Sequence, residues 1–238
     1  RGVFDIPATI LPTRCTEPPP ELPNSYSDGG VTNPTYSEYQ FGGAGMWWPC
    51  RNIITAPLHI NELEQHHEIT QDGISIWGAI PGQRCDSTRA EIIAATGILA
   101  APGPIHTGVD SLNFIKYAQK LVANIDMKPK LLYGLMPNGD VWEVFHKHLR
   151  AKGVCSALFT KVLGHAKSED IEKGRTTLKD MVGNGIADTA AGKGILAHTS
   201  NIIQYSDKCG TREKLRQFLQ IDNNSFLLDM LQCNREIV

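Results

Sequence analysis

Four acidic residues occupy positions where folding alone does not readily explain an acid: Asp28, Glu91, Asp110 and Asp188. Asp28 ends a strand pattern, and Asp110 closes another, the apolar run 105–109. Glu91 lies in the first turn of a helix pattern with apolar neighbours, and Asp188 lies in a run of small residues. Each has a structural role open to it, as a helix cap, a partner of the helix dipole, a turn residue or a solvated helix residue.

Brought together, these four carboxylates would be a costly cluster of like charges unless cations neutralise it. Hard oxygen ligands of this kind favour Mg²⁺, with Mn²⁺ as a substitute. Two such ions about 4 Å apart can clamp the attacking water and the leaving oxygen of a phosphodiester displacement. The acids therefore predict a metal-dependent nuclease.

The surrounding patterns predict the elements that would position the acids. Strand patterns at 25–27, 41–48 and 73–80 come first, and residues 105–109 and 154–163 form two more. Helix patterns lie at about 87–100, 111–122, 141–152 and 181–191, with Ser87 or Thr88 as the N-cap of the first. We expect an α/β fold: a mixed five-stranded sheet, three antiparallel strands then parallel strands, flanked by helices. Asp28 and Asp110 would converge at one edge of this sheet, and Glu91 and Asp188 would reach it from helices.

The segments outside this pattern divide the chain into three parts. Residues 1–23 are rich in proline and predict an extended arm or linker. Residues 24–194 would be the α/β domain. Residues 195–238 would be a helical extension, with two helical patterns at 212–219 and 225–232. Residues 49–71 and 167–180 read as inserts; the first, which contains His66 and His67, is expected to be a surface loop or short helix.

Five blocks along the chain resemble, in order, the motifs of the ribonuclease H family. The first joins S-D-G-G at 27–30 to N-P at 33–34 and G-G-A-G at 42–45. The others are R-A-E-I-I-A-A at 89–95, V-D-S at 109–111, K-V-L-G-H-A at 161–166 and N-G-I-A-D-T-A-A at 184–191. Each block alone is a weak signal, but five in order are a strong one, and they cover about residues 24–193. The best match is a type 1-like ribonuclease H domain.

The resemblance implies a function and a role for each residue. The domain would be an endonuclease that hydrolyses the RNA strand of RNA–DNA hybrids by a two-metal mechanism. Two Mg²⁺ ions would be held by the four acids, and His165, on a loop, would assist proton transfer or product departure. A further set of residues would contact the 2′-hydroxyl and the backbone of the hybrid. These substrate-binding residues are Asn33, Ser87, Thr88, Arg89 and Ser111.

Composition bears on the charge of the surface, on membrane association and on the cellular compartment. The net charge is −2, with −6 on residues 1–72 and +4 on the remainder, so any basic face is mild. No apolar run is long enough for a membrane span, and residues 1–10 lack the apolar core of a signal peptide. The six cysteines form no C-x-x-C pair, which favours free thiols in a reducing compartment, the cytoplasm or nucleus. By analogy, a reverse transcriptase domain of a retroelement polyprotein is the expected partner.

Two other functions remain open from the sequence. A DNA nuclease or transposase of the same fold would use a similar acidic cluster. A non-catalytic module that binds nucleic acid or protein could keep the fold without the reaction. The Glu91 helix and the Gly164-His165 loop favour ribonuclease H over the first, and the presence of all four carboxylates speaks against the second.

Overall fold

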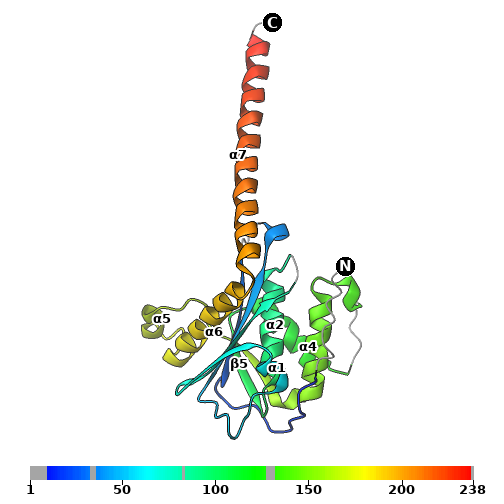
Figure 1. Ribbon diagram of the computed structural model, residues 1–238, viewed down its shortest axis with the longest axis vertical. Helices are drawn as coiled ribbons and strands as arrows, with labels where there is room; N and C mark the ends of the chain where they lie inside the picture. The colour runs from blue at the N-terminus through cyan, green and yellow to red at the C-terminus, as the bar shows by residue number, and fades with distance from the viewer. Residues whose placement is uncertain (1–9, 33–35, 82–83, 127–131, 237–238) are drawn as a thin grey trace.

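A six-stranded mixed sheet forms the centre of the computed structural model, which describes residues 10–32, 36–81, 84–126 and 132–236 (Figure 1). Its strand order is β3-β4-β2-β1-β5-β6. Strands β1 to β4 pair antiparallel, whereas β5 pairs parallel with β1 and with β6. The strands are β1 (Ser25–Val31), β2 (Gly42–Pro49), β3 (His66–Thr70), β4 (Gly73–Ile80), β5 (Ile105–Val109) and β6 (Ala157–Lys161).

Helices cover both faces of the sheet. One face packs against α6 (Leu178–Leu196), which contacts β1, β2 and β4. The other face packs against α2 (Ser87–Ala100), which in turn contacts α3 (Leu112–Ala123) and α4 (Gly139–Lys152). The remaining elements are the short helices α1 (Ile60–Leu63) and α5 (Ser168–Glu172), the 3-10 turns η1 (Ser37–Tyr39), η2 (Tyr133–Leu135) and η3 (Val154–Ser156), and the long helix α7 (Ser200–Glu236). The mixed α/β architecture of the prediction is confirmed.

The predicted count of five strands is wrong, because the insert at 49–71 supplies a sixth. Residues expected to form only a loop or a short helix form α1 and then β3, which pairs antiparallel with β4 from His66 to Thr70. Every residue of β3 is exposed, so the strand lacks the buried apolar face on which strand recognition from sequence depends. Arg51 fixes the rest of the insert through a buried ion pair with Glu62, at 2.6 Å.

Two helix predictions also need correction. The N-cap of α2 is Asp86, one residue before Ser87, and its carboxylate accepts a hydrogen bond from the Arg89 N–H at 2.6 Å. The two helical patterns in the tail belong to one continuous helix, α7, which projects from the body of the molecule as a rod (Figure 1). No glycine or proline interrupts the chain between the two patterns, so nothing there ends the helix.

The main core lies between the sheet and the layer formed by α2, α3 and α4. Met46 and Trp48 of β2 point into it, and Phe114 of α3 stacks on Trp142 of α4 with ring centroids 5.6 Å apart. Trp47, on the opposite side of β2, packs toward α6 in a smaller cluster with Tyr26, Val162 and Ala187. These contacts fix both helix layers relative to β1 and β2.

The proline-rich arm lies on the body of the protein from residue 10 onward. The Cys15 N–H donates to the Lys152 carbonyl at 2.7 Å, and the Pro20 carbonyl is 2.9 Å from His106 Nδ1. The arm therefore packs against α4 and β5 without adding a strand. The five described cysteines are free thiols. Among the described residues, no helix is long and apolar enough to span a membrane.

Candidate active site

Strand pairing places Asp28 and Asp110 side by side. Ser27 of β1 is in register with Val109 of β5, so the residues that follow them on these parallel neighbours are Asp28 and Asp110. Asp28 continues in β1, opposite Gly45 of β2, while Asp110 lies just beyond the end of β5. The predicted convergence of these two acids at one edge of the sheet is what the structure shows.

Glu91 reaches the same place because α2 lies directly against β1. A methyl group on Gly29 would overlap the backbone of Ala90 and Glu91, so only glycine permits this approach. Asp28, Glu91 and Asp110 then each offer a carboxylate oxygen, and these oxygens all lie within 4.8 Å of one another. Asp28 and Glu91 are buried, and Asp110 is half-buried.

This arrangement is electrostatically unfavourable for the protein alone. Burial, followed by the charges of the nearby Asp110 and Asp188 carboxylates, raises the pKa of Asp28 to about 7. Burial, followed by the charges of Asp28 and Asp110, also holds the pKa of Glu91 well above its usual range. The Glu91 Oε2 atom is buried and has no hydrogen-bond partner among the described residues. Within that part of the chain, none of the three acids forms an ion pair with a Lys or Arg side chain.

Asp188 lies at the margin of this cluster, near enough to Asp28 to raise its pKa but outside the group of three. Its helix, α6, is seated on β2 because a methyl group at Gly45 would overlap the Ala187 and Ala191 backbone. The Asp188 carboxylate is half-exposed and lies 3.8 Å from Nδ1 of His165. The structure therefore brings four predicted acids into one region, three tightly and one loosely.

His165 occupies a tight turn between β6 and α5. Its backbone is left-handed, with φ of 48°, and its side chain is exposed. The preceding residue, Gly164, lies against Asp110, because a methyl group there would overlap the Asp110 carboxylate. The Gly-His pair thus forms one side of the acid cluster, with the imidazole directed to Asp188.

The start of α2 carries three of the residues predicted to contact substrate. Ser87 and Thr88 precede Glu91 by four and three residues, so they lie on its face of the helix. Arg89 points elsewhere and forms a bidentate ion pair with Asp140 of α4, at 2.8 and 2.6 Å. Ser111 caps α3, accepting a hydrogen bond from the Phe114 N–H. Asn33 lies outside the described residues.

One positioning contact was missed at the sequence level. The Tyr26 hydroxyl donates to Asp180 Oδ1 at 2.9 Å, tying β1 to the first turn of α6. Tyr26 lies two residues before Asp28 on the same strand, and its ring packs against Gly183 of α6. Its place on the strand of Asp28 was the available signal, but a tyrosine in a strand is usually only a core residue.

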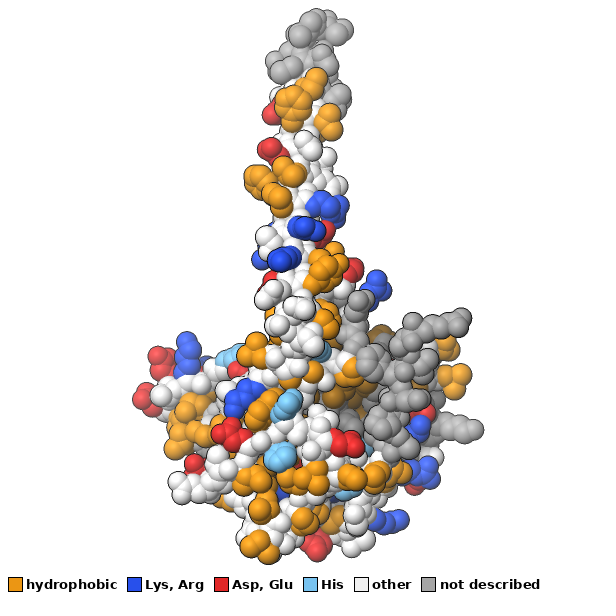
Figure 2. Space-filling view, viewed as in Figure 1, with side chains coloured by type: hydrophobic (Ala, Val, Ile, Leu, Met, Phe, Trp, Pro, Cys, Tyr) orange, Lys and Arg blue, Asp and Glu red, His pale blue; other side chains and the backbone are white. Residues whose placement is uncertain are grey.

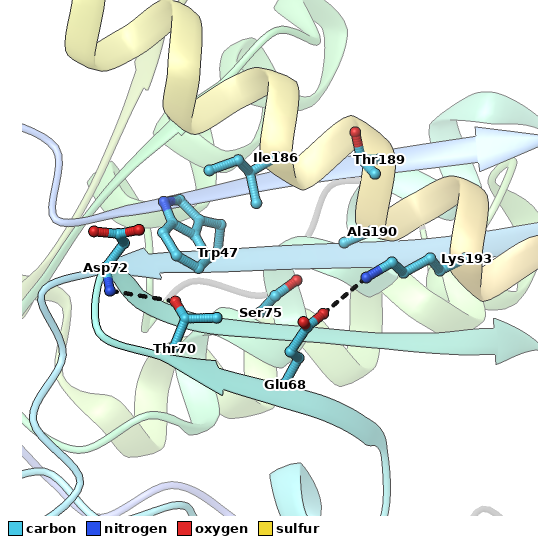
Figure 3. A pocket seen from close by; sticks show the side chains of 9 residues that line it. All are labelled: Trp47, Glu68, Thr70, Asp72, Ser75, Ile186, Thr189, Ala190 and Lys193. Carbon is cyan, nitrogen blue, oxygen red and sulfur yellow. Dashed lines mark hydrogen bonds and ion pairs between the residues drawn. The ribbon is translucent and has the colours of Figure 1, made fainter.

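A separate pocket of about 230 Å³ lies between α6 and the β2–β4–β3 side of the sheet. Figure 3 shows Trp47 and Ile186 at one end of it and Lys193 paired with Glu68 at the other. Lys193 also lies over the ring of Trp77, 4.5 Å from its centroid. None of the four predicted acids lines this pocket, so it is distinct from the acid cluster.

The acid cluster fits a divalent cation. Its donors are carboxylate oxygens, which Mg²⁺ and Mn²⁺ prefer. The buried Glu91 oxygen has no hydrogen-bond partner among the described residues, and the raised pKa of Asp28 means that ionising this carboxyl is costly without a nearby cation. Asp28, Glu91 and Asp110 would hold such an ion, with Asp188 able to contribute from the exposed side.

Comparison with known proteins finds similar folds among solved structures. No family profile matches the sequence, and no curated protein matches it. Prototype foamy virus protease-reverse transcriptase is 19% identical, with a TM-score of 0.45, over 76% of this chain and 22% of that one. LC9-RNase H1, a type 1 RNase H with the type 2 active-site motif, is 14% identical, with a TM-score of 0.43, over 77% and 75%. The RNase H domain of PFV is 19% identical, with a TM-score of 0.42, over 72% and 93%.

The topology of the chain itself defines its fold. Strands β1 to β4 pair antiparallel and are followed by the parallel strands β5 and β6, α2 and α6 cover opposite faces, and the acids meet where β1 and β5 lie side by side. Apart from the sixth strand, β3, that architecture is the one predicted from the sequence. In the order and pairing of its elements, the chain resembles the ribonuclease H fold.

Proposed function

We propose that the protein is a metal-dependent endonuclease that hydrolyses the RNA strand of RNA–DNA hybrids. The observation that carries the proposal is the convergence of Asp28, Glu91 and Asp110 around a buried carboxylate oxygen with no partner. This is an arrangement that costs the folded protein stability and that a bound divalent cation would relieve. The order of the five sequence motifs supports hybrid RNA as the substrate.

Each residue has a distinct part in the proposed reaction. Asp28, Glu91, Asp110 and Asp188 would hold two Mg²⁺ ions. When bound, the ions would supply activation of water and neutralisation of charge on the phosphodiester. His165 can take up or deliver a proton at Nδ1, the atom that faces Asp188. The products would carry 3′-hydroxyl and 5′-phosphate ends.

Recognition of the substrate is proposed for the surface beside the cluster. The Ser87 and Thr88 hydroxyls lie on the helical face of Glu91, where they can bond to the nucleic-acid backbone. Contacts to the 2′-hydroxyl would select RNA over DNA, and the candidates from the sequence are Asn33 and the backbone around Ser87–Arg89. Arg89 would have to exchange its bond with Asp140 for a phosphate. The free thiols favour a reducing compartment, and the proposed partner is a reverse transcriptase domain, whose activity makes such hybrids.

The test is cleavage of labelled substrates by the purified chain. An RNA–DNA hybrid, and the matching single- and double-stranded RNA and DNA, are each incubated with Mg²⁺, with Mn²⁺ and with chelator. Asp110→Asn tests the cluster, and Asp207→Asn, an exposed acid on α7, is the matched control. We expect metal-dependent cuts confined to the RNA strand of the hybrid, lost in Asp110→Asn and retained in Asp207→Asn.

Other outcomes would overturn the proposal in different ways. Cleavage of DNA would identify a DNA nuclease or transposase-type enzyme. Absence of cleavage by a folded protein would favour a binding module. Thermal unfolding separates these cases further, because Mg²⁺ should raise the melting temperature of the wild type but not of Asp110→Asn.

A further inference from the structure

The long helix α7 leaves most of its surface exposed. Beyond its base it contacts η1, where Ser206 donates to the Tyr39 carbonyl at 2.6 Å and the Tyr36 hydroxyl donates to Gln217 at 3.4 Å. Figure 2 shows apolar side chains along the projecting rod, with lysine and arginine nearer its base. The large exposed apolar residues from the middle of the helix onward are Leu215, Phe218, Leu219, Ile221, Phe226, Leu227, Leu228 and Met230. A lone helix with so much exposed apolar surface is typical of one that pairs with another.

A regular seam runs along one side of α7. Its members follow one another in alternating steps of three and four residues, the spacing of a coiled coil. They are Tyr205, Lys208, Arg212, Leu215, Leu219, Asp222, Phe226 and Asp229. Two leucines form its middle, the cations precede them, and the acids follow.

The seam faces away from the body of the protein. Gln217 and Ser206, which are bonded to the η1 region, lie about half a turn around the helix from Leu215. The seam residues are all exposed, and within the described part of the chain Arg212, Asp222 and Asp229 form no ion pair. The seam is therefore free to receive another helix.

We propose that α7 pairs antiparallel with α7 of a second copy of this chain, through this seam. The two-fold axis lies between Leu215 and Leu219, so Leu215 of each copy lies opposite Leu219 of the other. In the same register, Arg212 lies opposite Asp222, and Lys208 lies opposite Phe226. Each contact occurs twice because of the symmetry. Phe218 and Met230 flank the seam and extend its apolar strip.

The charges of the seam select this orientation over a parallel one. A parallel pair in register would place Arg212 against Arg212, Asp222 against Asp222 and Lys208 against Lys208. Each of those contacts juxtaposes like charges in a partly dehydrated interface, which opposes association. In the antiparallel pair, Arg212 of each copy instead attracts Asp222 of the other, and the Lys208 ammonium can lie on the ring of Phe226.

The test is the oligomeric state of the full chain by sedimentation velocity over a range of concentrations. The variants are Arg212→Asp, Asp222→Arg and the two combined, and Lys214→Asp is the matched charge reversal off the seam. Circular dichroism checks that every variant keeps its helix content. No nucleic acid is present, so the outcome is independent of the proposed nuclease function.

We expect a concentration-dependent dimer in the wild type and in Lys214→Asp. Each single seam reversal should raise the dissociation constant at least ~10-fold, because it replaces two attractions by two repulsions. The combined variant should return to within about threefold of the wild type, since the swapped charges again meet opposite partners. A wild-type monomer at all concentrations, a larger oligomer, or a combined variant as weak as the singles would overturn the proposal.

Discussion

Replacing Asp28 with asparagine should make the metal-free protein more stable while abolishing its proposed activity. The change is isosteric, and the asparagine Oδ1 can still accept the hydrogen bond that the Gly29 N–H donates to Asp28 at 2.7 Å. What disappears is the buried negative charge beside Glu91 and Asp110. This single substitution would therefore raise the stability of the metal-free protein and abolish its proposed activity.

The size of the effect follows from the pKa of Asp28, which burial and the nearby acids raise from 3.8 to about 7. A carboxyl whose pKa is higher in the folded than in the unfolded state costs stability as pH rises through that interval. The difference corresponds to about 4 kcal/mol at pH 7.5, falling to about 2 kcal/mol at pH 5, where the folded wild type is already protonated. Asparagine removes this cost. For a chain of this size, 4 kcal/mol corresponds to roughly 10 °C in melting temperature.

The assay is thermal unfolding in chelator at pH 7.5 and at pH 5, followed by a Mg²⁺ titration. Asp28→Asn should melt above the wild type at pH 7.5, and the gap should narrow at pH 5. Saturating Mg²⁺ should raise the melting temperature of the wild type but not that of Asp28→Asn, by an amount set by the ratio of metal concentration to dissociation constant. Asp207→Asn, on the exposed side of α7, should stay within about 0.5 kcal/mol of the wild type in every condition.

Two results would refute this reasoning. If Asp28→Asn melts below the wild type in chelator at pH 7.5, the carboxylate stabilises the fold and the cluster is not under electrostatic strain. If its gain in stability is the same at pH 5 as at pH 7.5, the gain does not come from removing an ionised group. Either result would remove the main physical argument for a bound cation.

Three further variants test the parts around the acids. His165→Ala should lower the rate of hybrid cleavage about 100-fold without changing the Mg²⁺-induced rise in melting temperature, because the imidazole is exposed and holds no core contact; an unchanged rate would exclude it from proton transfer. Gly164→Ala should raise the Mg²⁺ concentration needed for half-maximal cleavage several-fold, since its methyl group would displace the Asp110 carboxylate; an unaltered Mg²⁺ dependence would contradict that contact. Tyr26→Phe should cost about 1–2 kcal/mol in urea unfolding by removing the hydroxyl bond to Asp180, and no loss of stability would show that this bond does not hold α6.

Much of the fold could be predicted because its elements carry strong periodic signals. The strand 105–109 and the α2 pattern were found nearly to the residue, and the convergence of Asp28 with Asp110 followed from the rule that parallel strand ends share an edge. Glu91 was placed by its position in the first turns of α2. The remaining information, which sequence patterns do not give, was the register between β1 and β5 that places Asp28 beside Asp110.

The failures have equally physical causes. β3 is exposed on all its residues, so its pairing with β4 leaves no hydrophobic alternation in the sequence. Asp86 competes with Ser87 as a cap, and residue types alone do not decide between neighbouring good caps. The loose position of Asp188 also depends on where α6 settles on β2, a distance set by tertiary contact that no local pattern encodes.

The close seating of α2 on Gly29 and of α6 on Gly45 has a consequence for how the sequence can vary. Both acid-bearing helices rest on strand backbone, so the spacing of the acids is set by main-chain contact and not by side chains that can be exchanged gradually. A saturation mutagenesis library should therefore show a sharp contrast. Core positions with large apolar residues, such as Ile92 or Ile98, should tolerate substitution by other apolar residues of similar volume. Gly29 and Gly45 should tolerate no larger residue, not even alanine. Over evolution, apolar core residues would be replaced by others of similar volume, whereas Gly29 and Gly45 would not change.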